Sequence, residues 1–284
     1  KDMAEESQVP AEMAGAYTDL YLNDSADVMP PVQAIALFDE FNNLMPPGEQ
    51  GDEMIRKLAD RLAAVDLLDR AADLLKQQVQ FRLQGVEKAR VGARLATLQI
   101  VNRQPALAVE ALRLSDGGNL PPELVDQRRI LMARALVDQG LHTQALAHLE
   151  NDESEKADLL RVEVFWQKQD WPNAAKVLRR LVRASGAVAG KPLSEEQAHY
   201  VLNYAVAMTL SGNERGMARI RSDFGAAMRG SEFKDAFDLI SSPASIGLID
   251  YRTVAGRVEQ VSNFGKFMAS YRERLKAGQL SQLN

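Results

Sequence analysis

Five segments of this chain share one spacing of residues, and that spacing constrains the fold more than any other feature. Each segment holds the end of an apolar stretch, a short polar or turn-forming break, a small residue at its tenth place and an aliphatic residue four places later. The segments are LAAVDLLDRAADLL from Leu62, QIVNRQPALAVEAL from Gln99, LVDQGLHTQALAHL from Leu136, FWQKQDWPNAAKVL from Phe165 and AMTLSGNERGMARI from Ala207. Self-similarity at a fixed period indicates a chain built by stacking one structural unit.

The small residues recur at steps of 37, 37, 37, 29 and 42 residues, counting an earlier copy, PVQAIALFDEF. They are Ala34, Ala71, Ala108, Ala145, Ala174 and Gly216, and the larger residues that follow them are Phe38, Leu75, Leu112, Leu149, Leu178 and Ile220. A small side chain lets two helix axes approach closely, and a residue four places later lies on the same helix face. The repeated unit is therefore predicted to be a helical hairpin in which each small residue marks a close crossing. The unequal last steps indicate that the array becomes irregular toward its end.

Local helix signals favour the same all-helical interpretation. Pro105 and Pro172 lie near the start of a second helix, where a missing N–H costs little. Ser194 and Gln197 have the spacing of a capping box before an apolar run. A sheet would need several alternating runs rich in β-branched residues, and the chain offers none. We place the remaining turn formers in connections between hairpins: Pro46, Pro47, Gly48, Pro121 and Pro122.

The hairpins resemble the tetratricopeptide-repeat family, with residues 133–149 as the best copy. Small and large packing residues of that family match Ala133, Leu136, Gly140, Ala145 and Leu149, and VFWQKQDWPNAAKVL is a second copy. The resemblance covers roughly residues 31–225, but the dominant step is 37 instead of the family's 34. It implies an all-α fold, a right-handed α-solenoid of stacked antiparallel hairpins. We expect a flexible segment at residues 1–10, the repeat array at 11–241 and a capping helix with its tail at 242–284.

The C-terminal segment has its own helical pattern. Apolar residues step by three or four from Tyr251 to Leu275, and basic residues gather in the last turns. One amphipathic helix of this kind can cap the last hairpin, as a solenoid requires. It can alternatively dock a partner or self-associate, which would make the chain a homodimer or a structural adaptor.

Composition excludes several classes of protein and leaves the compartment open. The chain has no cysteine, which rules out disulfides, thiolate metal sites and a cysteine nucleophile. A net charge of −5 gives no general attraction to nucleic acid, and no apolar run is long enough to span a bilayer. The sequence starts without methionine or a leader pattern, so we expect a mature form or a fragment. Both the cytoplasm and the periplasm remain possible, with an anchor or signal upstream.

The loop RASGAVAGKPLS at residues 183–194 imitates a phosphate-binding loop but lacks its essential parts. Pro192 stands where the motif needs a hydroxyl, the glycine spacing is wrong, and the preceding segment reads as a helix. His142, His148 and His199 show no metal-ligand spacing, and no serine lies in a nucleophile elbow. We therefore expect no enzyme activity, no cofactor and no metal. The basic run LRRLVR at residues 178–183 is interpreted as a solvated helix face.

The function that remains is protein binding. Stacked hairpins curve, and their first helices line a concave groove that suits a peptide or a helix. The family register implies eight groove residues, among which Trp166 is a candidate anchor unless it packs in the core beside Phe165: Arg56, Asp60, Arg90, Thr97, Arg134, Glu163, Trp166 and Met208. The sequence thus predicts a non-enzymatic interaction scaffold, in a bacterial multi-protein assembly, for a protein or peptide partner. The alternative is an adaptor that self-associates through its C-terminal helix.

Overall fold

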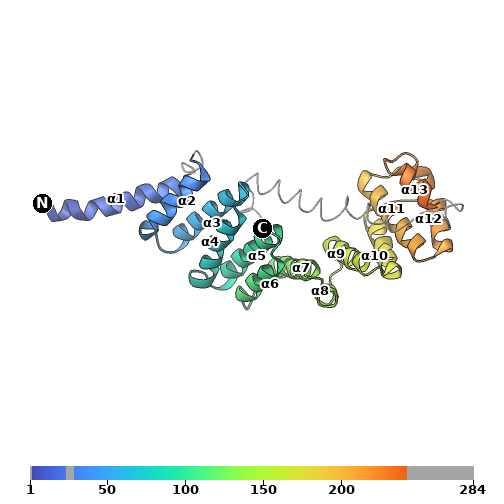
Figure 1. The fold of residues 1–284 in the computed structure, drawn as a ribbon, viewed down its shortest axis with the longest axis horizontal. Helices are drawn as coiled ribbons and strands as arrows, with labels where there is room; N and C mark the ends of the chain where they lie inside the picture. Colours follow the sequence, from blue (N-terminus) through green and yellow to red (C-terminus); the bar gives the residue numbers. More distant parts are fainter. Residues whose placement is uncertain (1, 24–28, 242–284) are drawn as a thin grey trace. The chain divides into compact units, whose positions relative to one another are not determined.

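The computed structural model describes residues 2–23 and 29–241, and every regular element in that part of the chain is a helix (Figure 1). No strand occurs among these residues, which confirms the all-α prediction. The described chain divides into two compact units, one that ends at Gln139 and one that starts at Gly140. The predicted C-terminal helix at residues 251–275 lies outside the described residues.

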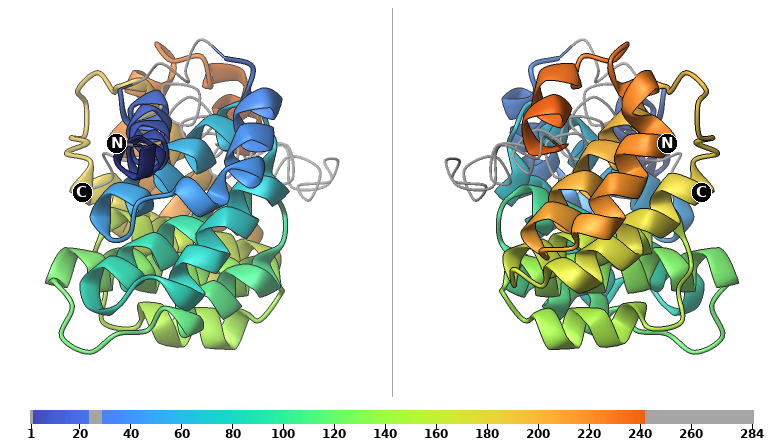
Figure 2. Two further views of the ribbon diagram at one scale, coloured as in Figure 1. Left: turned by 90° about the vertical axis from the view of Figure 1, so that its left-hand side faces the viewer. Right: turned by 90° about the vertical axis from the view of Figure 1, so that its right-hand side faces the viewer.

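Among the described residues, the first unit contains seven α-helices and one short 3-10 helix, η2. Its elements are α1 (Asp2–Leu22), α2 (Pro31–Glu40), η2 (Asn42–Leu44), α3 (Glu49–Ala64), α4 (Leu68–Phe81), α5 (Gly85–Val101), α6 (Pro105–Leu114) and α7 (Pro122–Asp138). Each helix from α3 to α6 packs against the next one, and α5 also contacts α7. The left-hand view of Figure 2 faces the blue helices of this unit.

The second unit contains six α-helices in the range that the structure describes, up to Ser241. They are α8 (His142–Leu149), α9 (Glu155–Gln167), α10 (Trp171–Ala184), α11 (Glu195–Leu210), α12 (Glu214–Met228) and α13 (Lys234–Ser241). Helices α9 to α13 share one hydrophobic core. The right-hand view of Figure 2 faces the yellow and orange helices of this unit.

Burial at the repeated positions agrees with the predicted spacing. The five alanines at the repeated small position are all fully buried, and the larger residues four places later are buried as well. The predicted caps are also present: Pro105 begins α6, Pro172 is the second residue of α10, and Ser194 with Gln197 forms a capping box on α11. Pro122 differs slightly from the prediction, because it is the first residue of α7.

A residue in the left-handed conformation sits in the middle of every hairpin turn. These residues are Asp66, Arg103, Gly140, Gln169 and Gly212, each with φ between 55° and 72°. In four of the turns the next residue donates its N–H to the carbonyl five positions back, for example Asp170 to Phe165 O at 2.8 Å and Asn213 to Met208 O at 3.0 Å. This bond closes a Schellman-type helix end, and the chain can then start the second helix at once.

The turns correct the register of the last copy by one residue. In the earlier copies the small residue is the fourth residue of the second helix, five places after the left-handed residue. The same count from Gly212 leads to Met217, which is buried, and the predicted Gly216 is only partly buried. Gly216 still marks a close approach, because a Cβ there would lie 2.7 Å from Met208 Sδ. The prediction failed because this copy was aligned one residue too early: three residues separate α11 from α12, as they separate the two helices of the hairpins from α3 to α10.

We predict that Gln169→Gly stabilises the second unit by about 1 kcal/mol, because only glycine adopts the left-handed conformation without steric cost. Gly212→Ala puts a side chain on a residue in the same left-handed conformation, so it is expected to lower the free energy of unfolding by about 1 kcal/mol. Urea unfolding followed by tryptophan fluorescence measures both, since Trp166 and Trp171 are the two tryptophans of the chain. Equal stability of the two variants would contradict a strained turn.

Helix α1 differs from the expectation of a flexible segment at residues 1–10, because it begins at Asp2 and continues through Pro10. A proline normally ends or kinks a helix, so the sequence favours a boundary there. Downstream, Tyr21 donates its hydroxyl to Ala34 O at 2.6 Å, and its ring lies edge-on to Phe38. Burial raises the pKa of Tyr21 to about 12. These contacts fasten the C-terminal half of α1 to the first repeated position.

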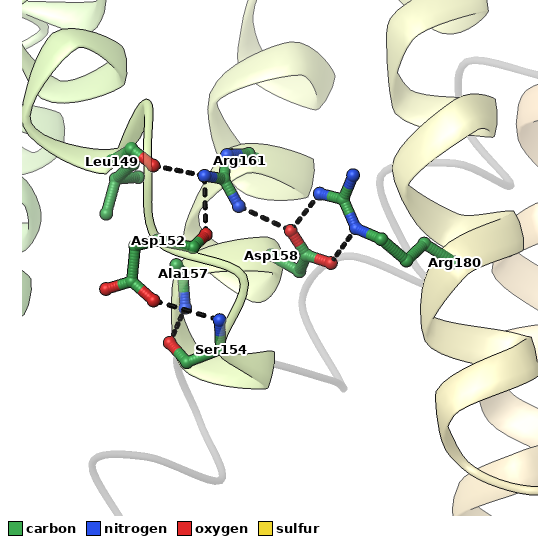
Figure 3. Close-up of polar contacts among 7 residues, drawn as sticks. All are labelled: Leu149, Asp152, Ser154, Ala157, Asp158, Arg161 and Arg180. Carbon is green, nitrogen blue, oxygen red and sulfur yellow. Dashed lines mark hydrogen bonds and ion pairs between the residues drawn. The ribbon is translucent and has the colours of Figure 1, made fainter.

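Buried charge reinforces the second unit at the start of α9 (Figure 3). The Asp158 carboxylate is 2% exposed and accepts hydrogen bonds from Arg161 and from Arg180 of α10. Arg161 also donates to the carbonyls of Leu149, the last residue of α8, and of Asp152 in the loop that follows. The Asp158 carboxylate thus connects α9 to α10. Through Arg161 it is also linked to the loop before α9.

A buried arginine plays the corresponding role in the first unit. Arg128 on α7 is 8% exposed and donates to Ala89 O in α5 at 2.7 Å, to Leu112 O in α6 at 2.6 Å and to Ser115 Oγ at 3.0 Å. Burial lowers the pKa of its guanidinium, and the nearby Asp116 acts in the opposite direction. Three helices therefore meet at one side chain.

Candidate functional site

The eight predicted groove residues do lie on first helices of hairpins, but most of them serve internal packing. Asp60, Thr97, Arg134 and Trp166 are buried, and Arg56, Glu163 and Met208 are partly buried. Only Arg90 is exposed, and it forms an ion pair of 3.4 Å with Glu87. Five of the eight belong to the first unit and three to the second.

Local partners explain why the polar members of this set are buried. Asp60 forms an ion pair with Arg94 of the next first helix, α5. Thr97 donates its hydroxyl to Ala93 O at 2.8 Å, one turn back on its own helix. Arg134 pairs with Asp138 at 2.5 Å, again within one helix. Their hydrogen-bonding capacity is therefore directed at their own unit, as buried polar groups require.

The interpretation of Trp166 as an exposed anchor is wrong, and the alternative of a core residue is confirmed. Trp166 is 5% exposed and lies edge-on to Trp171 with 5.3 Å between ring centroids. Phe165 is the partly exposed member of the pair. Trp166 faces α10 because α9 turns that side toward the shared core, so it is not available to a partner.

The other motifs that the sequence singled out contact neighbouring parts of the fold. Gly190 donates its N–H to Asp223 O at 2.9 Å, so the loop at residues 185–194 is fastened to α12. His142 bonds to Gln167, and His199 is buried against the ring of Phe233. Over residues 2–23 and 29–241 no group of three potential metal ligands occurs. No helix in the same ranges has the length and apolarity needed to cross a bilayer.

A different set of residues converges in the second unit, and we call it the Tyr204 face: Tyr204, Arg179, Arg183 and Arg219. Tyr204 lies on α11, which packs against both α10 and α12. Arg179 and Arg183 lie four residues apart on one side of α10, and Arg219 lies on α12. All three arginines are exposed, whereas Tyr204 is 8% exposed.

The three cations act electrostatically on the phenol of Tyr204. Burial raises the pKa of Tyr204, and the guanidinium groups of Arg179, Arg183 and Arg219 all act to lower it. Such an effect needs the charges to be near the hydroxyl, because Coulomb energy decreases with distance and with solvent screening. Residues from two helices therefore direct positive charge at one polar atom.

The groups of the Tyr204 face lack internal partners in the part of the chain that the structure describes. There, none of the three arginines forms an ion pair, and the Tyr204 hydroxyl makes no hydrogen bond. Tyr200, one turn earlier on α11, is the contrast: its hydroxyl donates to Glu155 Oε1 at 2.5 Å. The Tyr204 hydroxyl is not among the buried polar atoms that lack a partner, so it reaches solvent although most of its side chain is covered. The Tyr204 face can therefore bind an anion that accepts hydrogen bonds from both the phenol and the guanidinium groups.

Two of the four residues of the Tyr204 face could be noticed in the sequence. Arg179 and Arg183 belong to the basic run that we interpreted as solvated, and they are indeed exposed. Tyr204 and Arg219 come from separate helices, and only the packing of α10, α11 and α12 brings them to the same place. Helical spacing alone gives no sign of that convergence.

Comparison with protein-family models, with curated proteins and with solved structures found no match. The function is therefore argued from the arrangement of this chain's own residues.

Proposed function

We propose that this chain is a non-enzymatic protein-interaction scaffold that holds an acidic segment of a partner protein on the Tyr204 face. In this proposal the hairpins form a tetratricopeptide-like, right-handed solenoid, and the chain works in a bacterial multi-protein assembly. The proposal rests on the Tyr204 hydroxyl, which makes no hydrogen bond in the described chain, and on three exposed arginines of α10 and α12 that form no ion pair there and act electrostatically on this hydroxyl.

Carboxylates fit this face for two physical reasons. Arginine forms short, charge-assisted hydrogen bonds with carboxylate oxygens, and its planar group offers two parallel donors. A phenol donates one more hydrogen bond to the same oxygens. Aspartate or glutamate on an extended or helical segment can reach the face because its arginines lie at the surface of α10 and α12.

A protein segment is favoured over nucleic acid by the charge of the whole chain. Nucleic-acid binding needs a broad basic footprint that follows the phosphate backbone. This chain carries 39 acidic residues against 34 basic ones, so positive charge is concentrated locally instead of spread over the surface. A compact cluster of this kind gives orientation and specificity to a short acidic contact.

We predict that Arg179→Gln, Arg183→Gln and Arg219→Gln together weaken binding of a fluorescein-labelled glutamate decapeptide at least tenfold, since three rim charges are lost. Tyr204→Phe is expected to weaken it by about threefold through the lost hydrogen bond. Fluorescence anisotropy with the full chain at low ionic strength measures both effects.

Two controls separate the site from general charge. The triple variant Arg70→Gln, Arg103→Gln and Arg113→Gln changes the net charge by the same amount at exposed positions of the first unit. Tyr200→Phe removes a phenol whose partner is internal. Equal weakening by the control variants would contradict the proposal. If a ten-nucleotide single-stranded DNA or phosphatidylserine vesicles bound more tightly than the glutamate decapeptide, the partner would be a nucleic acid or a membrane instead of an acidic protein segment.

A further inference from the structure

The loop between α6 and α7 contains the only Asp-Gly pair of the sequence, Asp116 followed by Gly117. Both residues lie outside helices, because α6 ends at Leu114 and α7 begins at Pro122. Asp116 is exposed and Gly117 is partly exposed, so water reaches this part of the loop. An exposed carboxyl group is therefore followed directly by a residue that has no side chain.

The loop holds the backbone nitrogen of Gly117 close to the carboxyl group of the residue before it. This nitrogen donates its hydrogen to Asp116 Oδ1 at 3.1 Å, and Oδ1 is bonded to the carboxyl carbon, Cγ. Bond formation between the nitrogen and Cγ closes a ring of five atoms, and holding two reacting groups together greatly accelerates their reaction. Because glycine has no Cβ, no side chain hinders the approach.

Other aspartates that accept backbone hydrogen bonds are held in a different way. Asp152 Oδ1 accepts from the N–H of Ser154 at 2.9 Å, and Asp170 Oδ1 accepts from the N–H of Asn173 at 3.3 Å. These donors lie two and three residues later, so their nitrogens cannot close the same ring. The arrangement at Asp116 brings together the two groups that can react.

We propose that Asp116 and Gly117 form a modification site at which the chain converts aspartate into isoaspartate through a succinimide. In the first step the Gly117 nitrogen bonds to Asp116 Cγ. One carboxyl oxygen leaves as water, with the amide hydrogen and one proton from the solvent. Water then opens the ring: cleavage at Cγ restores aspartate, and cleavage at the main-chain carbonyl gives isoaspartate. Water and protons are the only other reactants.

Isoaspartate changes the loop because it inserts one methylene group into the main chain. The loop has little space for it, since a Cβ at Gly117 would already lie 3.3 Å from Gly85 O. Directly before Asp116, the hydroxyl of Ser115 accepts a hydrogen bond from Arg128 of α7 at 3.0 Å. Extra atoms in a packed region displace their neighbours, so we expect the product to weaken the contacts of Arg128. This site belongs to the first unit and does not depend on the Tyr204 face.

The test follows the full chain during weeks at body temperature in mildly acidic buffer. Endoproteinase Asp-N cuts before aspartate but not before isoaspartate, and intact mass detects the loss of one water in the succinimide. We expect cleavage before residue 116 to disappear at least tenfold faster than cleavage before Asp152. The blocked peptide acetyl-Ser-Asp-Gly-Gly-Asn-amide, with the sequence of residues 115–119, tests the role of the fold. We expect the folded chain to react at least as fast as this peptide, and a slower reaction in the folded chain would overturn the proposal.

Two neighbouring glycines provide a matched pair of variants. Gly117→Ala adds a Cβ at the attacking residue, and we expect at least tenfold slower loss of cleavage before residue 116. Gly118→Ala adds the same group where no atom lies within 4 Å, and the rate should stay unchanged. Equal rates in the two variants would overturn the assignment of Gly117 as the nucleophile.

The product itself tests the predicted effect on the fold. Chromatography separates the isoaspartate form from the unmodified chain, and we expect it to unfold at a lower urea concentration. Equal urea midpoints for the two forms would contradict the weakening of the Arg128 contacts. None of these results bears on the glutamate decapeptide, so each proposal fails or stands separately.

Discussion

Arg128→Met is expected to lower the free energy of unfolding of the first unit by about 3 kcal/mol, because hydrogen bonds to a charged group contribute roughly 1.5 to 3 kcal/mol and several are lost together. Methionine keeps most of the apolar stem but donates nothing. The carbonyls of Ala89 and Leu112 then lose a buried donor, and so does the Ser115 hydroxyl. The C-terminal end of α6 also loses a cation that complements its dipole.

Arg129 provides the matched control, because it is the next residue on the same helix. Its side chain is 32% exposed and pairs with Asp126 three residues earlier. Exposed pairs of this type contribute less than about 1 kcal/mol, so Arg129→Met should be nearly neutral. Urea unfolding followed by circular dichroism compares the variants, and hydrogen exchange locates the loss to α5, α6 and α7. Similar stability of both variants would show that Arg128 does not hold these helices together.

Asp158→Ala is expected to destabilise the second unit by about 3 kcal/mol, since breaking a buried ion pair leaves an uncompensated charge. The Arg161 side chain is 12% exposed and would lose its carboxylate partner while remaining inside. It would keep only the carbonyls of Leu149 and Asp152, visible in Figure 3. The loop before α9 would then be held by fewer strong contacts.

Arg180→Ala removes the other partner of the same carboxylate. It deletes a charge that is largely exposed, whereas Asp158→Ala deletes one that is buried. The Arg180 side chain is 52% exposed, and its hydrogen bond to Asp158 raises its own pKa. Solvent screening limits the loss to about 1 kcal/mol or less. Tryptophan fluorescence reports the unfolding of both variants, because both tryptophans belong to this unit. If Asp158→Ala lowered the free energy of unfolding no more than Arg180→Ala, the buried Asp158 carboxylate would not be the main stabilising group of this cluster.

The spacing of small residues predicted the hairpins because it reflects a local requirement of helix packing. Ala71, Ala108 and Ala174 have no side chain to keep the neighbouring helix away, and each is fully buried. Capping signals such as Ser194 were equally local and equally informative. The register of the last copy was predicted one residue too early. Gly216 is small, but the buried position lies five residues after the left-handed residue of the turn, Gly212.

Turn conformation was hard to predict where glycine is absent. Asp66, Arg103 and Gln169 adopt the left-handed conformation that usually indicates glycine or asparagine. Tertiary packing of the two helices imposes the turn, and the residue accepts the strain. Division into two units was also invisible, because no change of composition marks Gln139.

The binding surfaces could not be predicted because they depend on which charged residues find partners inside the fold. Arg128 and Arg129 are adjacent in the sequence, yet one is buried and the other lies at the surface. Family register directed attention to the first helices, where Thr97 and Trp166 turned out to be core residues. Tyr204 lies on α11, between the second helices α10 and α12, which begin 43 residues apart in the sequence.

Local fluorescence tests most directly whether partner binding occurs on second helices, as on the Tyr204 face, or on first helices. The chain has no cysteine, so one cysteine at a time can carry a bimane label at Ala218, beside Arg219 on α12, or at Gln167 on the first helix α9. Both positions are exposed. With the glutamate decapeptide, we predict a saturable change for the label at position 218 and none at position 167. A response at position 167 with none at position 218 would contradict the placement of the binding surface.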